Sequence, residues 1–327
     1  MSSRIVCSLL ILTLAACGAT APAVSATEIT ESEEMTEQAQ QFLLLDEDCG
    51  ACDIAVDTDG TLLVADQYNK VIWRLKDGTM KPYAGKITEA DLYGQPLGGY
   101  VDGKLEESVF GLPWAIAPFL DGWAVSDASN DAVRLIHKDE VETVNGRTKE
   151  NLTVTDLGVA FDYPTGLTAD DQGNLYVSDT HQGAVRCISK DGSVTTVVDD
   201  VEGPMGVCWS DGVLYIAENG ANRIVMVDQD GQKKTLAGSG EAGCADGAAT
   251  KAQFSCPQRV IAGPDGTLYI SDTGNGAVRC ISGGQVTTLE VMERLFSPAG
   301  LLVQNNTLYI CDSFSRRILQ VDLEENE

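Results

Sequence analysis

Short apolar segments recur along the chain, and each of them ends in an acidic residue. A run of about five mainly apolar residues is typical of a buried β-strand. The six copies are Leu62–Asp66, Trp123–Asp127, Leu175–Asp179, Leu214–Glu218, Leu268–Asp272 and Leu308–Asp312. Their acidic ends lie 61, 52, 39, 54 and 40 residues apart. The shortest intervals match one four-stranded propeller blade, and the longer ones predict the same unit with inserted loops.

The third copy shows the strands of one unit. Strand-like segments over Pro164–Ala169, Asn174–Asp179, Ala184–Ile188 and Ser193–Val198 are separated by short turns that contain glycine. Asp and Gly relieve the unusual dihedral angles of such turns. One sheet of this kind cannot bury both of its faces, so the copies must stack on one another. We therefore predict an all-β chain folded as a six-bladed β-propeller.

The ends of the repeated region predict how the ring closes. The sixth unit has three strands, Gly300–Gln304, Thr307–Asp312 and Arg317–Asp322, and then stops without a fourth. Gln41–Leu45 is a spare apolar strand ahead of the first unit. We expect it to pair with Arg317–Val321 and close the ring, because closure removes an exposed sheet edge.

Other residues also repeat at fixed places in the units. A Pro-x-Gly sequence opens three units (Pro164, Pro204 and Pro298), and Asn follows the acidic residue by three places in three units (Asn69, Asn130 and Asn275). The run Asp102-Gly103, Phe110, Pro113 recurs with the same spacing as Asp246-Gly247, Phe254, Pro257. Together with the Asp-Gly turns, these residues resemble the NHL-repeat family of β-propellers over residues 49–321. The resemblance implies the same six-bladed ring.

The first residues have the pattern of an export signal. One arginine precedes an apolar run from Ile5 to Ala16, which is too short to span a bilayer comfortably. Leu14–Cys17 resembles the bacterial lipobox, so residues 1–16 are predicted to be a signal peptide and Cys17 to be lipidated. Cleavage after Ala26, which would give a secreted protein, is the alternative. Either site predicts a location outside the cytoplasm.

Three parts are therefore expected: the signal peptide, an acidic tether over residues 17–40, and the propeller over residues 41–327. Eight acids and no bases lie between Glu28 and Asp48, and such a segment repels itself and stays extended. No later stretch is long and apolar enough to form a transmembrane helix. The lipid on Cys17 is the only predicted contact with the membrane.

The charge of the chain excludes some partners. It has 49 acidic and 22 basic residues, a formal net charge of −27. This charge argues against binding to nucleic acid and against adsorption to anionic lipid. The expected partner is a protein, peptide or glycan of the cell envelope, bound by a monomer.

Catalytic chemistry has few candidates. The acidic residue repeated in six units is expected to accept backbone N–H bonds, because catalysis needs unlike groups in unlike environments. Only His137 and His181 are present, on opposite faces, so neither a metal site nor a cofactor is predicted. The enzyme alternative is a hydrolase or lyase built around Asp53, His181 and Arg259.

The cysteines allow two interpretations. An even number of eight remains after Cys7 and Cys17, which favours disulfides in an exported protein. Spacing indicates Cys244–Cys256, which flank one insertion, and Cys49–Cys52. The alternative for Cys49 and Cys52 is a thiol redox or metal site.

Propeller geometry indicates one face for binding. The turns between second and third strands and the connections between blades leave the sheets on the same face, which we call the loop-rich face. The insertions Lys86–Gly111, Gly146–Tyr163 and Gly238–Ser255 are expected there, and loops on a rigid scaffold commonly carry binding sites. The candidate binding residues are Asp53, Trp114, His181, Met205, Gln258 and Arg259. We therefore expect a binding or scaffold module, with the enzyme at the centre of the same face as the alternative.

Overall fold

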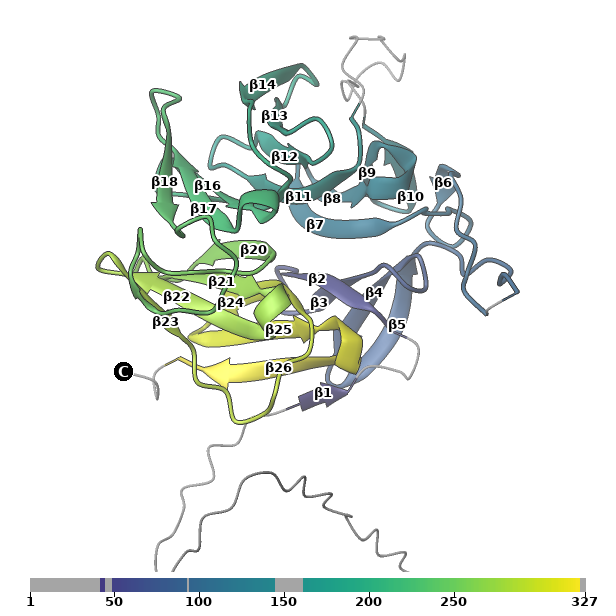
Figure 1. Cartoon of the computed structure of the whole chain (residues 1–327). Helices are drawn as coiled ribbons and strands as arrows, with labels where there is room; N and C mark the ends of the chain where they lie inside the picture. The colour runs from purple at the N-terminus through teal and green to yellow at the C-terminus, as the bar shows by residue number, and fades with distance from the viewer. Residues whose placement is uncertain (1–41, 45–48, 93, 145–160, 324–327) are drawn as a thin grey trace, which may run out of the picture. The chain divides into compact units, whose positions relative to one another are not determined.

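The structure is a computed structural model that describes residues 42–44, 49–92, 94–144 and 161–323. These residues form six antiparallel sheets around an axis, with the first strand of each sheet innermost (Figure 1). The predicted all-β fold with six blades is confirmed. No helix of these residues is long and apolar enough to cross a bilayer. The expected signal peptide, Cys17 and the acidic tether lie outside the described residues.

Each blade is a meander of consecutive strands. Blades 1 to 3 comprise β2 (Ala51–Val56), β3 (Leu62–Asp66), β4 (Val71–Lys76) and β5 (Thr79–Ala84); β7 (Pro113–Phe119), β8 (Gly122–Asp127), β9 (Ala132–His137) and β10 (Glu140–Thr143); β11 (Pro164–Ala169), β12 (Leu175–Asp179), β13 (Ala184–Ile188) and β14 (Val194–Val198). Blades 4 to 6 comprise β15 (Pro204–Ser210), β16 (Val213–Glu218), β17 (Arg223–Val227) and β18 (Lys233–Ala237); β20 (Pro257–Ala262), β21 (Leu268–Asp272), β22 (Ala277–Ser282) and β23 (Gln285–Thr288); β24 (Pro298–Gln304), β25 (Thr307–Asp312) and β26 (Arg317–Asp322). Four of the turns between second and third strands are short 3-10 helices: η1 (Ala128–Asn130), η2 (Asn219–Ala221), η3 (Thr273–Asn275) and η4 (Ser313–Ser315).

The sixth blade takes its outer strand from the other end of the chain. β1 (Phe42–Leu44) pairs antiparallel with β26, with Leu43 opposite Ile318. The predicted closing strand is thus confirmed for the part of it that the structure describes. At the same junction an apolar cluster joins Ile54 and Val64 of blade 1 to Ile318 of blade 6. Similar apolar clusters fill the other five junctions, so the core is a set of layers between blades rather than one central mass.

Two of the insertions do more than the sequence indicated. β6 (Gly103–Lys104) pairs with β10, and β19 (Gly247–Ala248) pairs with β23, so each insertion adds a fifth strand to the blade that follows it. The repeated Asp-Gly…Phe…Pro run belongs to this arrangement. Most of the third insertion, Gly146–Tyr163, lies outside the described residues.

The acidic residue that ends each second strand joins that strand to the chain entering the blade. One carboxylate oxygen accepts a backbone N–H from the entering connection; in blade 2, for example, Asp127 Oδ1 accepts from Gly111 and Leu112 at 2.8 Å. All six acidic side chains are fully buried. The same contact recurs from Gly50 to Asp66, Asp162 to Asp179, Glu202 to Glu218, Ser255 to Asp272 and Phe296 to Asp312. The structural role expected for these residues is what the geometry shows.

The second carboxylate oxygen takes a side-chain donor from the third strand. Arg134, Arg186 and Arg279 supply it from seven residues beyond the acid, and Trp73 Nε1 does so in blade 1. In blades 4 and 6 the donor is Arg223 or Arg317, five residues beyond the acid. Each buried negative charge therefore has a hydrogen-bonding partner, which a charge removed from water requires.

In the two five-stranded blades this arginine is enclosed. Arg279 is 1 % exposed and binds both Asp272 and Asp246, at 2.8 and 2.5 Å, with the ring of Phe254 5.2 Å from its guanidinium carbon. Arg134 is held in the same way by Asp127, Asp102 and Phe110. In both blades, the Asp and Phe of the repeated Asp-Gly…Phe…Pro run thus enclose a buried arginine.

Deleting residues 40–46 removes β1 and leaves β26 as an open edge. We expect the melting temperature to fall by about 5 °C or more, because the three-residue pairing and its hydrogen bonds are lost. Differential scanning calorimetry checks this. Deleting residues 28–34 shortens the chain by the same number of residues and is expected to leave the melting temperature unchanged. Equal melting curves for the two deletions would contradict closure by β1.

Replacing Asp272 by alanine leaves Arg279 buried with half of its charge pairing and Ser255 N–H without its acceptor. We expect the free energy of unfolding to fall by about 3–5 kcal/mol. Urea unfolding followed by circular dichroism measures it. Asp171→Ala, at an exposed turn, is the matched control and should change stability by less than about 0.5 kcal/mol. A loss no larger than the control's would show that the buried acid is dispensable.

Candidate functional site

The six inner strands come closest to the axis at one position of the repeat. This position lies two residues after the residue that opens each first strand. It is occupied by Asp53, Ala115, Gly166, Gly206, Arg259 and Gly300. Four blades thus place a small residue at the axis, and the other two place opposite charges there.

The small residues are required by the close approach of neighbouring backbones. A Cβ atom on Gly166 would lie 2.1 Å from the carbonyl oxygen of Met205, and one on Gly206 would lie 2.5 Å from that of Gln258. A Cβ on Gly300 would lie 2.5 Å from the Cα of Asp53. All three distances are far below normal contact, so the first strands of blades 3, 4 and 6 accept only glycine here. The narrowest part of the ring is set by backbone.

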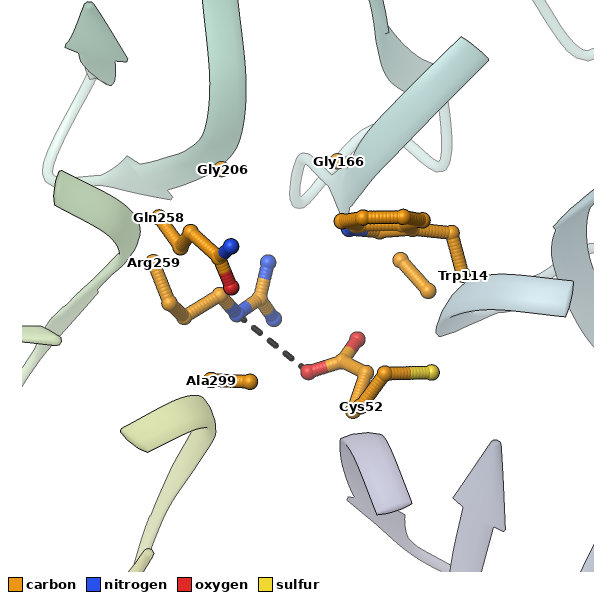
Figure 2. Close-up of a pocket in the computed structure, with 9 residues that line it drawn as sticks. Cys52, Trp114, Gly166, Gly206, Gln258, Arg259 and Ala299 are labelled. Carbon is orange, nitrogen blue, oxygen red and sulfur yellow. Dashed lines mark ion pairs between the residues drawn. The ribbon is translucent and has the colours of Figure 1, made fainter. Parts of the chain in front are cut away.

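Asp53 and Arg259 face one another across this constriction. Arg259 Nε lies 3.4 Å from Asp53 Oδ1, and the dashed line in Figure 2 marks this ion pair. Asp53 Oδ2 accepts the backbone N–H of Ile116 at 3.1 Å, so the carboxylate also ties blade 1 to blade 2. Asp53 is 2 % exposed, and this burial raises the pKa of its carboxyl, while the Arg259 charge lowers it. Neither Asp53 Oδ1 nor Arg259 Nε makes a hydrogen bond.

The space around this ion pair is very small. The side chains of Trp114, Gln258 and Arg259 point into it (Figure 2), and its volume is about 10 Å³. That is room for about one water molecule. The candidate residues Asp53, Trp114, Gln258 and Arg259 are therefore brought together as expected, but they fill the centre of the loop-rich face. Met205, the fifth candidate from the inner strands, is buried beside them.

His181 does not join this group. Its ring stacks on Tyr163 with centroids 4.7 Å apart, and Tyr163 in turn meets the edge of Trp114 at 6.0 Å. His181 Nδ1 lies 2.9 Å from the carboxylate of Asp162, and the imidazole is more than half exposed. The three residues of the enzyme alternative thus do not converge, because one aromatic ring separates His181 from the axis.

The eight cysteines that the structure describes are free thiols. Cys49 and Cys52 are buried, and burial raises the pKa of both thiols, which opposes the thiolate that redox exchange or metal binding needs. Cys244 and Cys256 are exposed. A parallel bridge pairs Ala242 with Phe254. Cys244 and Cys256 each lie two residues after a member of this bridge, so they occupy equivalent positions on the two segments. The Cys244–Cys256 and Cys49–Cys52 disulfides stay predictions. Among the residues that the structure describes, no group of three or more His, Cys, Asp or Glu is placed to hold a metal ion.

A groove on the loop-rich face lies between blades 1 and 6. It has a volume of about 650 Å³, and its lining includes Tyr68 and Lys70 from the turn after β3 and Phe314 and Arg316 from the turn after β25. Phe314 is 76 % exposed, and its ring lies 6.1 Å from that of Phe296, which is 51 % exposed. Sequence reasoning missed these residues. The signal that was present is Ser313-Phe314-Ser315, an aromatic residue in a polar turn.

The exposed apolar residues concentrate in the connections between blades and the turns between second and third strands. Nine large apolar side chains are exposed among the described residues, and eight of them lie in blade connections or in a turn between second and third strands. These eight are Ile87, Leu92, Leu97, Tyr100, Val101, Met292, Phe296 and Phe314. Leu120, in a turn between first and second strands, is the ninth. The apolar surface of the ring is therefore strongly one-sided.

Comparison with known proteins agrees with this architecture. The NHL repeat family matches residues 161–188, which form β11, β12 and β13. Teneurin-3 of Danio rerio is 40 % identical over 85 residues, 21 % of this chain and 3 % of that protein. NHL repeat-containing protein 2 of Bos taurus is 30 % identical over 151 residues, 37 % of this chain and 21 % of that protein. The chain thus spans about a fifth or less of the length of these curated relatives.

Solved structures share the fold at low identity. An auxiliary nutrient binding protein from Bacteroides ovatus superposes with a TM-score of 0.62 at 16 % identity, covering 88 % of this chain and 74 % of that one. A gluconolactonase from Xanthomonas campestris gives 0.62 at 14 % identity, covering 85 % and 87 %, and a chain of a nidogen/laminin complex gives 0.54 at 17 % identity, covering 77 % and 84 %. Such neighbours include both binding proteins and enzymes, so they establish the fold alone. With its repeated residues, its six blades and these matches, the chain is a six-bladed β-propeller that contains an NHL repeat at residues 161–188.

Proposed function

We propose that this protein is a binding module that holds a protein or peptide partner on its loop-rich face, as a monomer outside the cytoplasm. The observation that carries the proposal is the one-sided placement of the exposed apolar side chains, since eight of the nine in the described part of the chain lie on the connections and turns of that face. Contiguous exposed apolar surface marks interaction sites in soluble proteins. Exposed aromatic residues flanked by arginine, as at Phe296 beneath Arg294, are typical of protein interfaces.

The centre of the face supports binding over catalysis. The Asp53–Arg259 pair is enclosed in about 10 Å³, which leaves no volume for a substrate next to the carboxylate. Residues on the rim are accessible instead, and the groove between blades 1 and 6 offers about 650 Å³. A partner that covers this groove would contact Phe314 and the Lys86–Gly111 insertion together, because Gln95 Nε2 bonds Tyr68 Oη at 2.9 Å along the groove.

The location of the protein is the second part of the proposal. The apolar run that stops at Cys17 supports export and lipidation, and the acidic tether of residues 17–40 would then hold the propeller away from the membrane. Anchoring by one end leaves the loop-rich face free for a partner in the cell envelope.

Removing the whole Lys86–Gly111 insertion is too coarse a test of binding. Phe110 is fully buried against Arg134, and Asp102 pairs with the same arginine, so that deletion also opens blade 2. Point substitutions of exposed residues test the face without this damage.

We expect Phe296→Ser/Phe314→Ser to lower partner capture at least about tenfold, because exposed aromatic anchors at an interface each contribute more than about 1 kcal/mol. Capture is measured by cross-linking the purified protein to an envelope extract and quantifying the bound proteins by mass spectrometry. Leu120→Ser is the control, because Leu120 is the exposed apolar residue on the opposite face (37 % exposed), and this variant should retain capture. Both variants should keep the parent melting temperature within a few degrees. Equal capture by the two variants would place the partner elsewhere.

We expect Cys17→Ser to move the protein from the membrane to the soluble fraction, because the acylated thiol is lost. Immunoblots of separated fractions check this, and Cys7→Ser, within the predicted signal peptide, should leave the protein in the membrane. Soluble protein from the parent and both variants, with Thr27 as its first residue, would instead show cleavage after Ala26.

A further inference from the structure

The axis of the ring opens on the face opposite the loops into an apolar cavity that none of the preceding functions uses. We call this cavity the axial funnel. It has a volume of about 330 Å³ and is lined by the later residues of all six inner strands. Its deep wall consists of fully buried residues: Ile54, Ile116, Leu167, Val207 and Leu301. Residues nearer the strand ends, such as Val56, Ala169 and Val303, are half-buried, so the funnel widens toward solvent.

Among the described residues that line the funnel, Arg259 is the only charged one. Its Nη1 donates to the carbonyl oxygens of Leu167 and Val207, at 3.3 and 3.2 Å, and both of these residues line the funnel. The guanidinium therefore lies at the inner end of the funnel. It separates the apolar space from the constriction where Asp53 lies.

This guanidinium has donors to spare. A guanidinium carries five N–H groups in a planar fork. Arg259 Nε is buried and, although it faces Asp53 Oδ1 at 3.4 Å, it donates no hydrogen bond. The hydrogen bonds of the described residues that involve this side chain are the two from Nη1. A cation that is only 15 % exposed and has unused donors is costly unless something accepts hydrogen bonds from them.

The surroundings decide what an acceptor must look like. Aliphatic walls favour an apolar body, since burying it removes its surface from water, and the volume lies in the range of small-molecule pockets. At the inner end, a carboxylate matches the fork of a guanidinium. A phosphate is a poorer match, because Asp53 already offsets much of the single positive charge. We propose that the axial funnel binds a small apolar carboxylate, with its head group at Arg259 and its apolar body toward the open end.

The repeat provides an independent argument for a purpose at this residue. The equivalent positions in blades 3, 4 and 6 are glycine, and blade 2 has Ala115, so the ring closes around the axis without an arginine. Arg259 and Asp53 are thus additions to the common architecture. Of the two, only Arg259 reaches the funnel. This site is separate from the loop-rich face, so its test is independent of the partner proposed there.

Isothermal titration of the mature protein with octanoate tests the proposal, with octanamide, octylammonium and acetate as matched probes. We expect octanoate to bind with a dissociation constant of about 0.1–1 mM, as its few non-hydrogen atoms allow. Octanamide should bind about tenfold more weakly because it lacks the charge. Acetate lacks the apolar body, and octylammonium has the opposite charge. Neither should show saturable binding at concentrations up to about ten times those used for octanoate. No saturation with octanoate, or equal binding of octylammonium, would overturn the proposal.

Two variants locate the site. Asp53→Asn/Arg259→Gln removes both charges together, leaving no unpaired ion, and should weaken octanoate at least tenfold while leaving octanamide unchanged. Ala169→Trp narrows the open end and should weaken both probes, and it serves alone if the double variant does not fold. Phe296→Ser/Phe314→Ser, on the other face, should bind octanoate as the parent does. Parent-like octanoate binding by both funnel variants would show that the site lies elsewhere.

Discussion

The ring depends on one repeated interaction, the buried carboxylate that ends each second strand. Its first oxygen accepts N–H groups of the connection entering the blade, and its second accepts a donor from the third strand. Three parts of one blade, which run from Ser255 to Arg279 in blade 5, are thus held at a single point. Because the entering connection comes from the preceding blade, the same contact also determines where each blade starts relative to its neighbour. A charge buried this completely is tolerated because both of its oxygens accept hydrogen bonds.

A second set of contacts continues this logic from blade to blade. The residue after the acid donates its side chain to the carbonyl oxygen that opens the next blade at four junctions: from Thr180 to Pro204, Asn219 to Pro257, Thr273 to Pro298 and Ser313 to Ala51. The last of these joins blade 6 to blade 1. The ring is therefore closed twice, once at its outer edge by β1 and once near the axis by Ser313.

The repeated features could be predicted from the sequence, and the unrepeated ones could not. The six copies of the pattern Leu-Tyr-Ile-Ser-Asp predicted the number of blades. The missing fourth strand of the last copy predicted that β1 closes the ring. The side chain that binds each acid could not be predicted. Arg279 and Arg317 lie at different distances in sequence from their acids, and only the fold brings both to a carboxylate. The sequence predicted that Asp53 and Arg259 lie at the centre of one face, but it did not predict their ion pair, because contact across the axis depends on the diameter of the ring. The separation of His181 from this ion pair could not be predicted either, because it results from the ring of Tyr163, on which His181 stacks.

The closing strand has a mechanical meaning as well as a thermodynamic one. β1 is the first paired segment of the described residues, and it is held by three residues opposite β26. Any tension applied to the N-terminal end enters the propeller through this strand before it reaches any other blade. β1, the strand that closes the ring at its outer edge, is therefore also the first strand to detach under tension. The bond from Ser313 to Ala51 lies beyond it and keeps blades 1 and 6 together after the outer strand has detached.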